Sequence, residues 1–496
     1  MSALKSTSQP PPGAIALHPD HPPLWSPLTG WLDQVADLVE DAAKGLRPEP
    51  VHDLRVTLRR CRSAAIGYEQ LDPSPAWRRL RKEAKRLLRE LGELRDVQVM
   101  RKWISRVGMV ESESGIRLLK ILENREAHAM RRAGKKLRAF ECKQWRKWAR
   151  ELPDRVHSIP ANSPAFELLV LQQWTDAYEL HRTAMRLRSK ISFHRLRVGL
   201  KRFRYSVESF LPARHALWGR ELKRLQDMLG EVHDVDVLWT EVYHLRPVVT
   251  ASERGKWRAA IENVRKPHLA VYRERMGNAK AKSRWEKWRA ELPSGASLER
   301  CRMDWLTVWA SFLDPDPQHS RHVARLATQL FDGAHIARGS ARLPRSARDL
   351  VEAAAIVRDV GRVEGDRHHQ KTSFRLIRRQ NPPPGWSAMH MARIACIARF
   401  HRGGLPHHEG WEGWRGIPDG ERPGLKLLGG ILRLAATFAA RVEPRIEAIK
   451  AGLRGESLVI RAAGYRAEEP LASRLAEARH LLESALHRPI VIEPSV

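Results

Sequence analysis

Long apolar runs are missing from this sequence of 496 residues. No stretch approaches the roughly 18 consecutive apolar residues that a membrane-spanning helix needs. The first residues, MSALKSTSQPPPG, contain no apolar core of the kind that a secretion signal has. The sequence therefore predicts a protein that has no membrane partner, is not secreted and works in the cytoplasm.

Cysteine and β-forming patterns are also scarce. The chain has 4 cysteines, which lie far apart and form no CxxC pair: Cys61, Cys142, Cys301 and Cys396. This spacing excludes a zinc knuckle and a disulfide framework and indicates reduced thiols. Few segments outside the C-terminus alternate Val, Ile or Thr with polar residues, which argues against a β-rich fold.

Positive charge, in contrast, is in large excess. Lys and Arg number 88 against 57 Asp and Glu, which gives a formal net charge of +31. Such an excess predicts an anionic partner, either nucleic acid, a phosphate polymer or an acidic membrane surface. Hydrophobic residues make up 42% of the chain, which is enough for folded cores and excludes a wholly disordered protein. At roughly 150 residues per domain, the length suggests about three folding units.

An internal repeat organises the N-terminal part of the chain. The segments VHDLRVTLRRCR (51–62) and FHRLRVGLKRFR (193–204) share most of their residues. Downstream, LLRELGELRDVQVM (87–100) matches LQDMLGEVHDVDVL (225–238). Further on, the motif QWRKWARELP recurs as RWEKWRAELP, and its repeated tryptophans are predicted to anchor the core.

The order of these segments is kept, and their offset along the chain is nearly constant. We therefore expect two copies of one helical bundle, over residues 25–160 and 164–295, packed about a pseudo-twofold axis. Residues 1–24 are rich in proline and are predicted to be a disordered tail. Residues 300–496 are predicted to form a separate domain.

The repeated helix carries a basic stripe beside its apolar face. At 100° per residue, four side chains of the first copy share one arc: His52, Arg55, Arg59 and Arg62. The second copy presents the same stripe: His194, Arg197, Lys201 and Arg204. Like charges three or four residues apart repel by about a few tenths of a kcal/mol per pair. A repulsion that occurs in both copies suggests that a bound anion normally relieves it, although a solvated charged face is the simpler alternative.

Phosphate is the anion that suits this stripe. The planar guanidinium of Arg donates two parallel, charge-assisted hydrogen bonds to phosphate oxygens. The following helix of each copy adds further candidate contacts: Lys82, Lys85 and Arg89 in the first copy, and Lys223 and Arg224 in the second. The repeated residues Asp96 and Asp234 either orient an Arg of the stripe or cap a helix.

The segments VHDLRVTLRR, FHRLRVGLKRFRY, LGELRDVQV and LGEVHDVDV resemble the CHAD family, the conserved histidine α-helical domain. The likeness covers about residues 25–295. It implies an all-helical, internally symmetric domain whose basic central channel binds inorganic polyphosphate, often at polyphosphate granules. By motif, the resemblance implies these contacts: His52, Arg55, Arg59, Arg60 and Arg62, with His194, Arg197, Lys201, Arg202 and Arg204.

The C-terminal third resembles a different family. The segments QHSRHVARLATQLFD, DLVEAAAIVRDVG and GGILRLAATFAARVEP are similar to the HD-like helical domain at the C-terminus of exopolyphosphatases of the Ppx/GppA class. The later segments SLVIRAAG and PIVIEP predict a small α/β cap. The glycine-rich phosphate loop of a catalytic exopolyphosphatase domain does not precede this region.

A working HD phosphohydrolase needs clustered His and Asp ligands for a divalent metal. His322 matches the first His and Asp359 matches the Asp of the His-Asp doublet. However, Arg358 replaces the His of the doublet, and Ala436 replaces the late Asp. We therefore expect a degenerate module that holds no metal and no cofactor, with His322 and Asp359 as remnants of the site.

These patterns predict a mainly α protein, with two pseudo-symmetric CHAD-like bundles followed by an HD-like helical domain and a small α/β cap. The leading hypothesis is non-catalytic binding of inorganic polyphosphate, with polyphosphate-metabolising enzymes as further partners. Two alternatives stay open. One is a metal-dependent HD phosphohydrolase acting on polyphosphate or nucleotides. The other is nonspecific nucleic-acid binding, although no RRM, KH or zinc-finger pattern is present and nucleic acid is expected only as a nonspecific competitor.

Overall fold

The computed structural model describes residues 27–245, 249–277, 283–338, 346–404, 411–440, 445–467 and 470–495. The tail predicted over residues 1–24 lies outside these ranges. The chain divides into two compact units, which we call the N-terminal unit (described residues up to Cys301) and the C-terminal unit (described residues from Arg302). No described helix combines the length and the apolar character that crossing a membrane requires.

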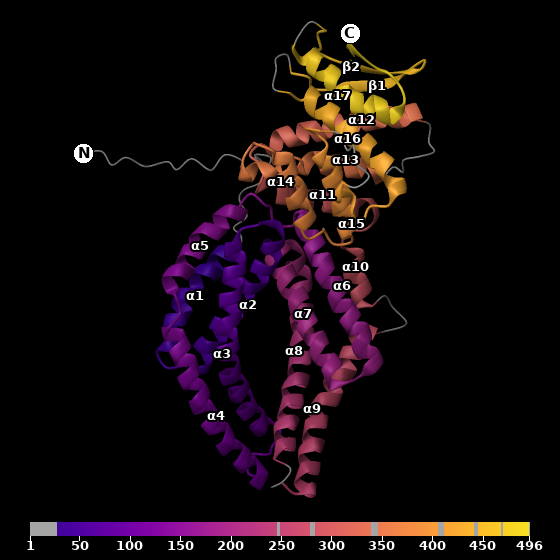
Figure 1. Cartoon of the computed structure of the whole chain (residues 1–496). Coiled ribbons are helices and arrows are strands. Elements are labelled where there is room, and N and C mark those ends of the chain that lie inside the picture. Colours follow the sequence, from indigo (N-terminus) through magenta and orange to yellow (C-terminus); the bar gives the residue numbers. More distant parts are fainter. Residues whose placement is uncertain are drawn as a thin grey trace, which may run out of the picture. The chain divides into compact units, whose positions relative to one another are not determined.

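The N-terminal unit is built from two successive sets of helices (Figure 1). The first set is α1 (Pro27–Ala43), α2 (Pro48–Leu71), α3 (Pro75–Arg106), α4 (Glu113–Arg138) and α5 (Cys142–Val156). The second set is α6 (Pro164–Leu187), α7 (Lys190–Phe210), α8 (Pro212–His244), α9 (Ala251–Gly277) and α10 (Arg284–Ala290). Equivalent neighbours pack in both sets, since α2 packs on α3 as α7 packs on α8, and α3 packs on α4 as α8 packs on α9.

Local sequence explains where these helices begin. Proline occupies the first turn of α2, α3, α6 and α8, where its missing N–H costs no intrahelical hydrogen bond. Ser189 and Ser283 form capping boxes at the starts of α7 and α10. The repeated tryptophans are buried as predicted, with Trp145 and Trp285 both 0% exposed.

The two sets of helices meet at two apolar junctions. At the first junction, the end of α2 approaches the end of α7, and the Phe210 ring packs against Gly67 and edge-on against Tyr68. At the second junction, the last turns of α3 and α8 share a buried cluster with α4 and α9 that includes Trp103 and Trp257. The basic segments of α2 and α7 lie between these junctions along the helices, so both copies present their stripes in the same region.

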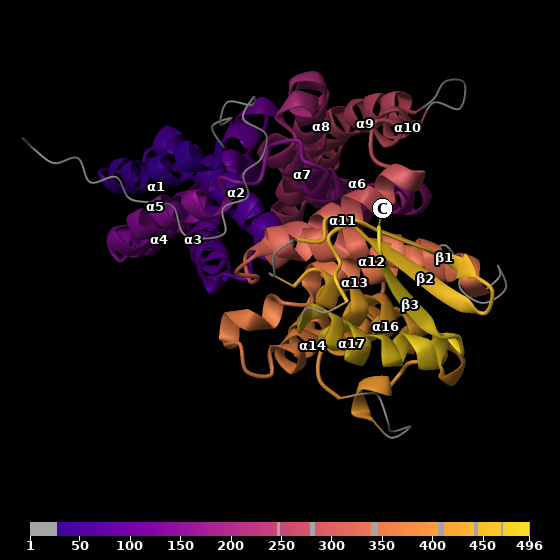
Figure 2. The same ribbon diagram turned by 90° about the horizontal axis from the view of Figure 1, so that it is seen from above.

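The C-terminal unit is a helical layer with a small sheet (Figure 2). Its helices are α11 (Gly295–Ser311), which contains the unit boundary, α12 (Pro317–Arg338), α13 (Ser346–Val357), α14 (His369–Arg379), α15 (Ala388–Arg399), α16 (Arg422–Phe438) and α17 (Pro470–Leu486). Short 3₁₀ turns cover Val360–Glu364, Glu412–Trp414 and Asp419–Glu421.

The sheet has the order β1 (Ile449–Arg454), β2 (Ser457–Ala462) and β3 (Ile490–Pro494). Strands β1 and β2 form an antiparallel hairpin whose turn contains Gly455 at φ +59°. Strands β2 and β3 are parallel, so the chain must cross over between them, and α17 makes this connection. The predicted mainly α fold with a small C-terminal cap is therefore confirmed.

We predict that the first junction tolerates no side chain at Gly67. A Cβ atom there would lie 2.3 Å from Cζ of Phe210, whose ring is buried. Gly67→Val should lower the free energy of unfolding by about 1–3 kcal/mol, measured by denaturant titration, because it overpacks the contact between the two copies. The matched control is Gly30→Ala in α1, where no described atom lies within 4 Å of the new Cβ. It should stabilise the helix by about 0.5–1 kcal/mol, and equal effects of the two changes would contradict this account.

Candidate anion-binding site and a cluster of possible metal ligands

Cations from both copies of the repeat come together between α2 and α7. Burial, followed by repulsion from Arg197, Arg59 and Arg55, lowers the pKa of Lys201 to about 7. Burial, followed by repulsion from Arg59, lowers the pKa of Arg55 to about 10. The two stripes therefore act on each other electrostatically, because residues of the first copy repel Lys201 of the second. No ion-pair partner for Arg59 or Lys201 exists among the described residues.

Two equivalent carboxylates accompany these cations. Asp96 on α3 interacts with Arg55 of its own copy and with Arg197 of the other copy. Asp234 on α8 interacts with Arg197 and Lys201, and the Trp103 indole donates a hydrogen bond to it. Burial raises the pKa of both carboxyl groups, and the neighbouring cations oppose that rise.

Both Asp residues lie in helix interiors, so neither caps a helix, and both interact electrostatically with cations of the stripes. We call the following set the central cluster: Arg55, Arg59, Arg197, Lys201, Asp96 and Asp234. It holds two more cations than carboxylates.

Several guanidinium groups near the central cluster have unused hydrogen-bonding capacity. Arg55 is 7% exposed, and its Nη1 donates to the Leu88 carbonyl over 3.3 Å. Gly92 lies beside this guanidinium, and a Cβ there would be in ordinary van der Waals contact with the same Nη1, at 3.6 Å. The buried Nε atoms of Arg62 and Arg197 find no hydrogen-bond partner in the described parts of the chain. Buried donors without partners are expensive, and an anion would satisfy them.

The predicted histidines lie at the edge of the same region. His52 and His194 are both exposed. Partial desolvation of each ring, followed by repulsion from Arg95 for His52 and from Arg197 for His194, lowers the pKa of each imidazole. The Nδ1 atom of His194 lies 3.1 Å from Nδ1 of His233, so one ring donates to the other.

The sequence analysis missed His233, although the repeat places it directly before Asp234, as Arg95 precedes Asp96. Burial and the neighbouring cations lower the pKa of His233 to about 3.

Two predicted contact residues have a structural partner instead. Arg60 donates to Glu208 across the two copies, with Nε 2.8 Å and Nη2 2.7 Å from Oε1. Arg204 donates to Oε1 of Gln226 over 3.0 Å and lies 3.5 Å from Oε2 of Glu208. Glu208 therefore joins α2 to α7, and no motif in the sequence predicted this role. Arg62 and Arg202 lie close enough to repel each other.

The predicted cations of α3 and α8 follow the same helical faces as Asp96 and Asp234. Lys82 and Lys85 are exposed and have no ion-pair partner in the described ranges, whereas Arg89 pairs with Glu90 at 3.0 Å. In the second copy, Lys223 pairs with Asp227 at 3.5 Å. Lys223 and Arg224 line a pocket of about 400 Å³ together with Arg220, Asp227, Met228, Glu231 and His268.

A separate polar pocket, of about 690 Å³, lies in the C-terminal unit. Asp359, His369 and His401 each offer a ligand atom there, and these atoms lie within 4.8 Å of one another. Nε2 of His369 is 3.1 Å from Oδ1 of Asp359 and 3.3 Å from Nε2 of His401. Two imidazoles and one carboxylate are a donor set that suits a divalent transition metal.

The charge state of these groups suits a metal, but Arg358 competes for the carboxylate. Although burial opposes it, Arg358 holds the pKa of Asp359 well below its usual range, so the carboxylate is charged. Burial lowers the pKa of His401 to about 4, so its ring is neutral at pH 7, as ligation requires. Nη2 of Arg358 lies 2.8 Å from Oδ2 of Asp359 and already supplies a positive charge.

The structure does not bring the two predicted remnants together. His322 is buried beside Arg325, whose Nη2 lies 2.8 Å from its Nδ1, and it does not line the pocket. His319, three residues earlier on α12, lines the pocket with Asp359. Ala436 also lines it, at the place where the sequence comparison expected a lost Asp. His319 and His322 are separated by about one turn of α12. Aligning the motif without gaps does not distinguish between them.

Comparison with known proteins identifies one part of the chain. No curated protein matches it. The family match reported below ends before the C-terminal unit, so the likeness of that unit to exopolyphosphatases stays a prediction. Residues 28–242 match the family model of the CHAD domain, and the chain therefore contains a CHAD domain within its N-terminal unit.

Proposed function

We propose that the N-terminal unit binds inorganic polyphosphate without changing it chemically. The observation that carries this proposal is the central cluster, in which cations from two copies of the repeat repel one another between α2 and α7. CHAD domains are linked to polyphosphate binding in general. A linear polyanion can neutralise the cations of both copies at once, which a single monovalent ion cannot do.

In this proposal the predicted residues have three roles. The first contacts with phosphate are made by His52, Arg55, Arg59, Arg62, His194, Arg197, Lys201 and Arg202. The bound phosphate chain then follows α3 and α8 and contacts Lys82, Lys85, Arg89, Lys223 and Arg224. Arg60 holds the copies together through Glu208, and Arg204 lies beside the same carboxylate within α7. We further propose that the protein resides in the cytoplasm at polyphosphate granules.

Neutralising one cation from each copy should weaken polyphosphate binding. We expect Arg59→Ala/Lys201→Ala to raise the Kd for polyphosphate of defined length by about 10-fold or more, because hydrogen bonds to charged groups contribute on that scale. The matched control is Lys143→Ala/Arg150→Ala, which removes the same charge from exposed positions on α5. Titration calorimetry over a salt series measures both, and binding should weaken as salt rises. Equal losses in the two variants would show that only net charge matters.

The nucleic-acid alternative is tested with the same two variants. Double-stranded DNA at matched phosphate concentration should compete weakly with polyphosphate, because a duplex is too wide to follow a path between two helices. If DNA displaced polyphosphate at equal phosphate concentration, the site would attract any polyanion, and the proposed specificity for polyphosphate would be wrong.

Polyphosphate binding should take up protons above neutral pH. With a pKa of about 7, Lys201 is mostly neutral in the free protein at pH 8, and an adjacent phosphate favours its charged form. Calorimetry at pH 8 in two buffers of different ionisation enthalpy should therefore give different binding enthalpies, and Lys201→Met should remove the difference.

The same lowered pKa gives a stability test without ligand. Between about pH 7 and 10.5 the unfolded chain holds the Lys201 proton that the folded chain has lost, so stability rises with pH across this window. Lys201→Met should flatten that rise, and an unchanged pH profile would refute the assignment.

A second candidate function is metal-dependent phosphohydrolysis in the C-terminal unit, favoured by the cluster of Asp359, His369 and His401. If it operates, protein purified without chelator should carry one divalent metal per chain, and His401→Ala should lose it. Metal-free wild-type protein that also fails to bind added Mn²⁺ or Zn²⁺ would eliminate this candidate and leave Arg358 as the permanent cation of the pocket.

A further inference from the structure

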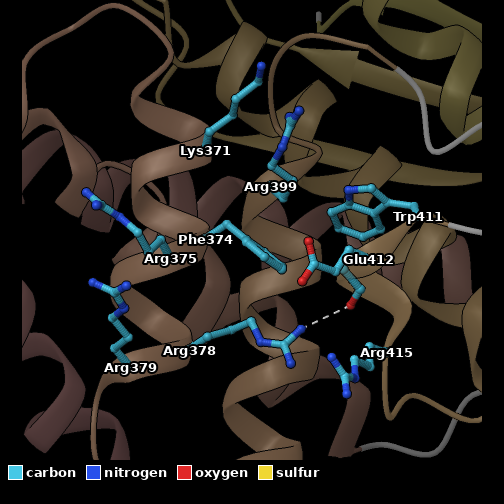
Figure 3. Close-up of a pocket in the computed structure, with 10 residues that line it drawn as sticks. Lys371, Phe374, Arg375, Arg378, Arg379, Arg399, Trp411, Glu412 and Arg415 are labelled. Carbon is cyan, nitrogen blue, oxygen red and sulfur yellow. Dashed lines mark hydrogen bonds between the residues drawn. The ribbon is translucent and has the colours of Figure 1, made fainter.

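A basic pocket with an aromatic wall lies in the C-terminal unit, apart from the residues discussed so far (Figure 3). Its volume is about 630 Å³, and it is formed by α14, the end of α15 and residues 411–415. Six cations line it: Lys371, Arg375, Arg378, Arg379, Arg399 and Arg415. Among the described lining residues, Glu412 alone is acidic, so the pocket keeps a large positive excess.

The spacing of residues on α14 creates this concentration of charge. Lys371, Arg375 and Arg378 follow the i, i+4 and i+7 positions and therefore share one face of the helix with Phe374. A soluble helix normally uses such a face for apolar packing. On α14 this face instead carries cations around the ring of Phe374. Like charges at these spacings repel, so this row of cations is unfavourable unless a counter-charge balances it.

Two of the six cations are held in place by the protein itself. Arg375 forms an ion pair with Glu364. Nη1 of Arg378 donates to the Gly413 carbonyl over 3.3 Å, and its guanidinium lies over the Phe374 ring at 5.4 Å. These contacts fix the walls of the pocket. They leave Lys371, Arg379, Arg399 and Arg415 without an ion-pair partner in the part of the chain that the structure describes.

Arg399 is the side chain that indicates most directly which ligand the pocket suits. Its Nη1 is buried and has no hydrogen-bond partner among the described residues, and burial lowers its pKa. Arg399 also repels Arg433. Figure 3 shows Arg399 and Lys371 extending in the same direction on one side of the pocket, beside Trp411. An oxyanion between them would accept the unused donor and separate the charges.

Aromatic rings form the apolar side of the pocket. Trp411 lies 5.4 Å from Phe374, 5.1 Å from Phe400 and 5.2 Å from Trp414, measured between ring centroids. These rings hold the 411–415 segment against α14 and α15. They also exclude water from one side of the cations, which strengthens the attraction of an anion.

We propose that this pocket binds a short, multiply charged phosphate compound at a site separate from the central cluster. The forked guanidinium of Arg399 and the mobile ammonium of Lys371 make the first contacts, and Arg379 and Arg415 extend the charged surface. The end of a phosphate chain and the triphosphate of a nucleotide share this chemistry.

The test uses the full-length chain with the Arg59→Ala/Lys201→Ala changes, which weaken the site proposed in the N-terminal unit. Tripolyphosphate and ATP are titrated separately by calorimetry at physiological ionic strength. Each should bind with one equivalent per chain. Adding Lys371→Ala/Arg399→Ala should raise the Kd by about 10-fold or more. The matched control is Lys450→Ala/Arg461→Ala, which removes the same charge from exposed positions on the sheet and should leave the Kd unchanged.

Each outcome of this experiment decides the proposal. Equal affinity for tripolyphosphate and ATP supports recognition of the phosphate chain, and tighter ATP binding supports an added contact of the base with Trp411. If neither ligand binds, or if the control variant loses as much affinity as the pocket variant, the proposal is wrong. Should the Arg399 change unfold the unit, as circular dichroism would show, Lys371→Ala/Arg379→Ala alters only exposed side chains and gives the same test. Long-chain polyphosphate binding by the chain with an unmodified N-terminal unit is independent of either result.

Discussion

Repulsion between cations of two repeated helices is the constraint on which the rest of the N-terminal unit depends. Left alone, Arg59, Arg197 and Lys201 would drive α2 and α7 apart. Apolar contacts on either side prevent this, with Phe210 against Gly67 at one junction and the buried Trp103 cluster at the other. The fold therefore holds mutually repelling cations between two favourable apolar contacts. A bound anion would lower the energy of this repulsion.

Duplication supplies this arrangement, but the two copies have diverged in ways that assign different roles to equivalent positions. Arg59 corresponds to Lys201, whose pKa is depressed into the physiological range, so one copy offers a permanent charge and the other a titratable one. Arg60 is used in an ion pair with Glu208, while its counterpart Arg202 stays exposed. The central cluster is thus symmetric in position and asymmetric in chemistry.

In the C-terminal unit, arginine side chains likewise determine the electrostatics of two pockets. In one pocket, Arg358 neutralises Asp359 where the neighbouring imidazoles would otherwise complete a metal site. In the other, Arg399 and Lys371 stand beside an aromatic wall, and Glu412 is the single carboxylate among the described lining residues. A guanidinium donates hydrogen bonds to a phosphate group, but it cannot activate a water molecule as a metal ion does.

The sequence by itself determined the helical character of the chain, the duplication, the basic stripe and the α/β cap, because helical periodicity and repeated motifs are local properties of neighbouring residues. The tertiary structure alone decided which charges face one another. It paired Arg60 with Glu208, joined His233 to His194, and placed His319 in the pocket where the motif had suggested His322. Such partners are far apart in the chain or differ by one turn of a helix, and only the packing of helices against each other selects among them.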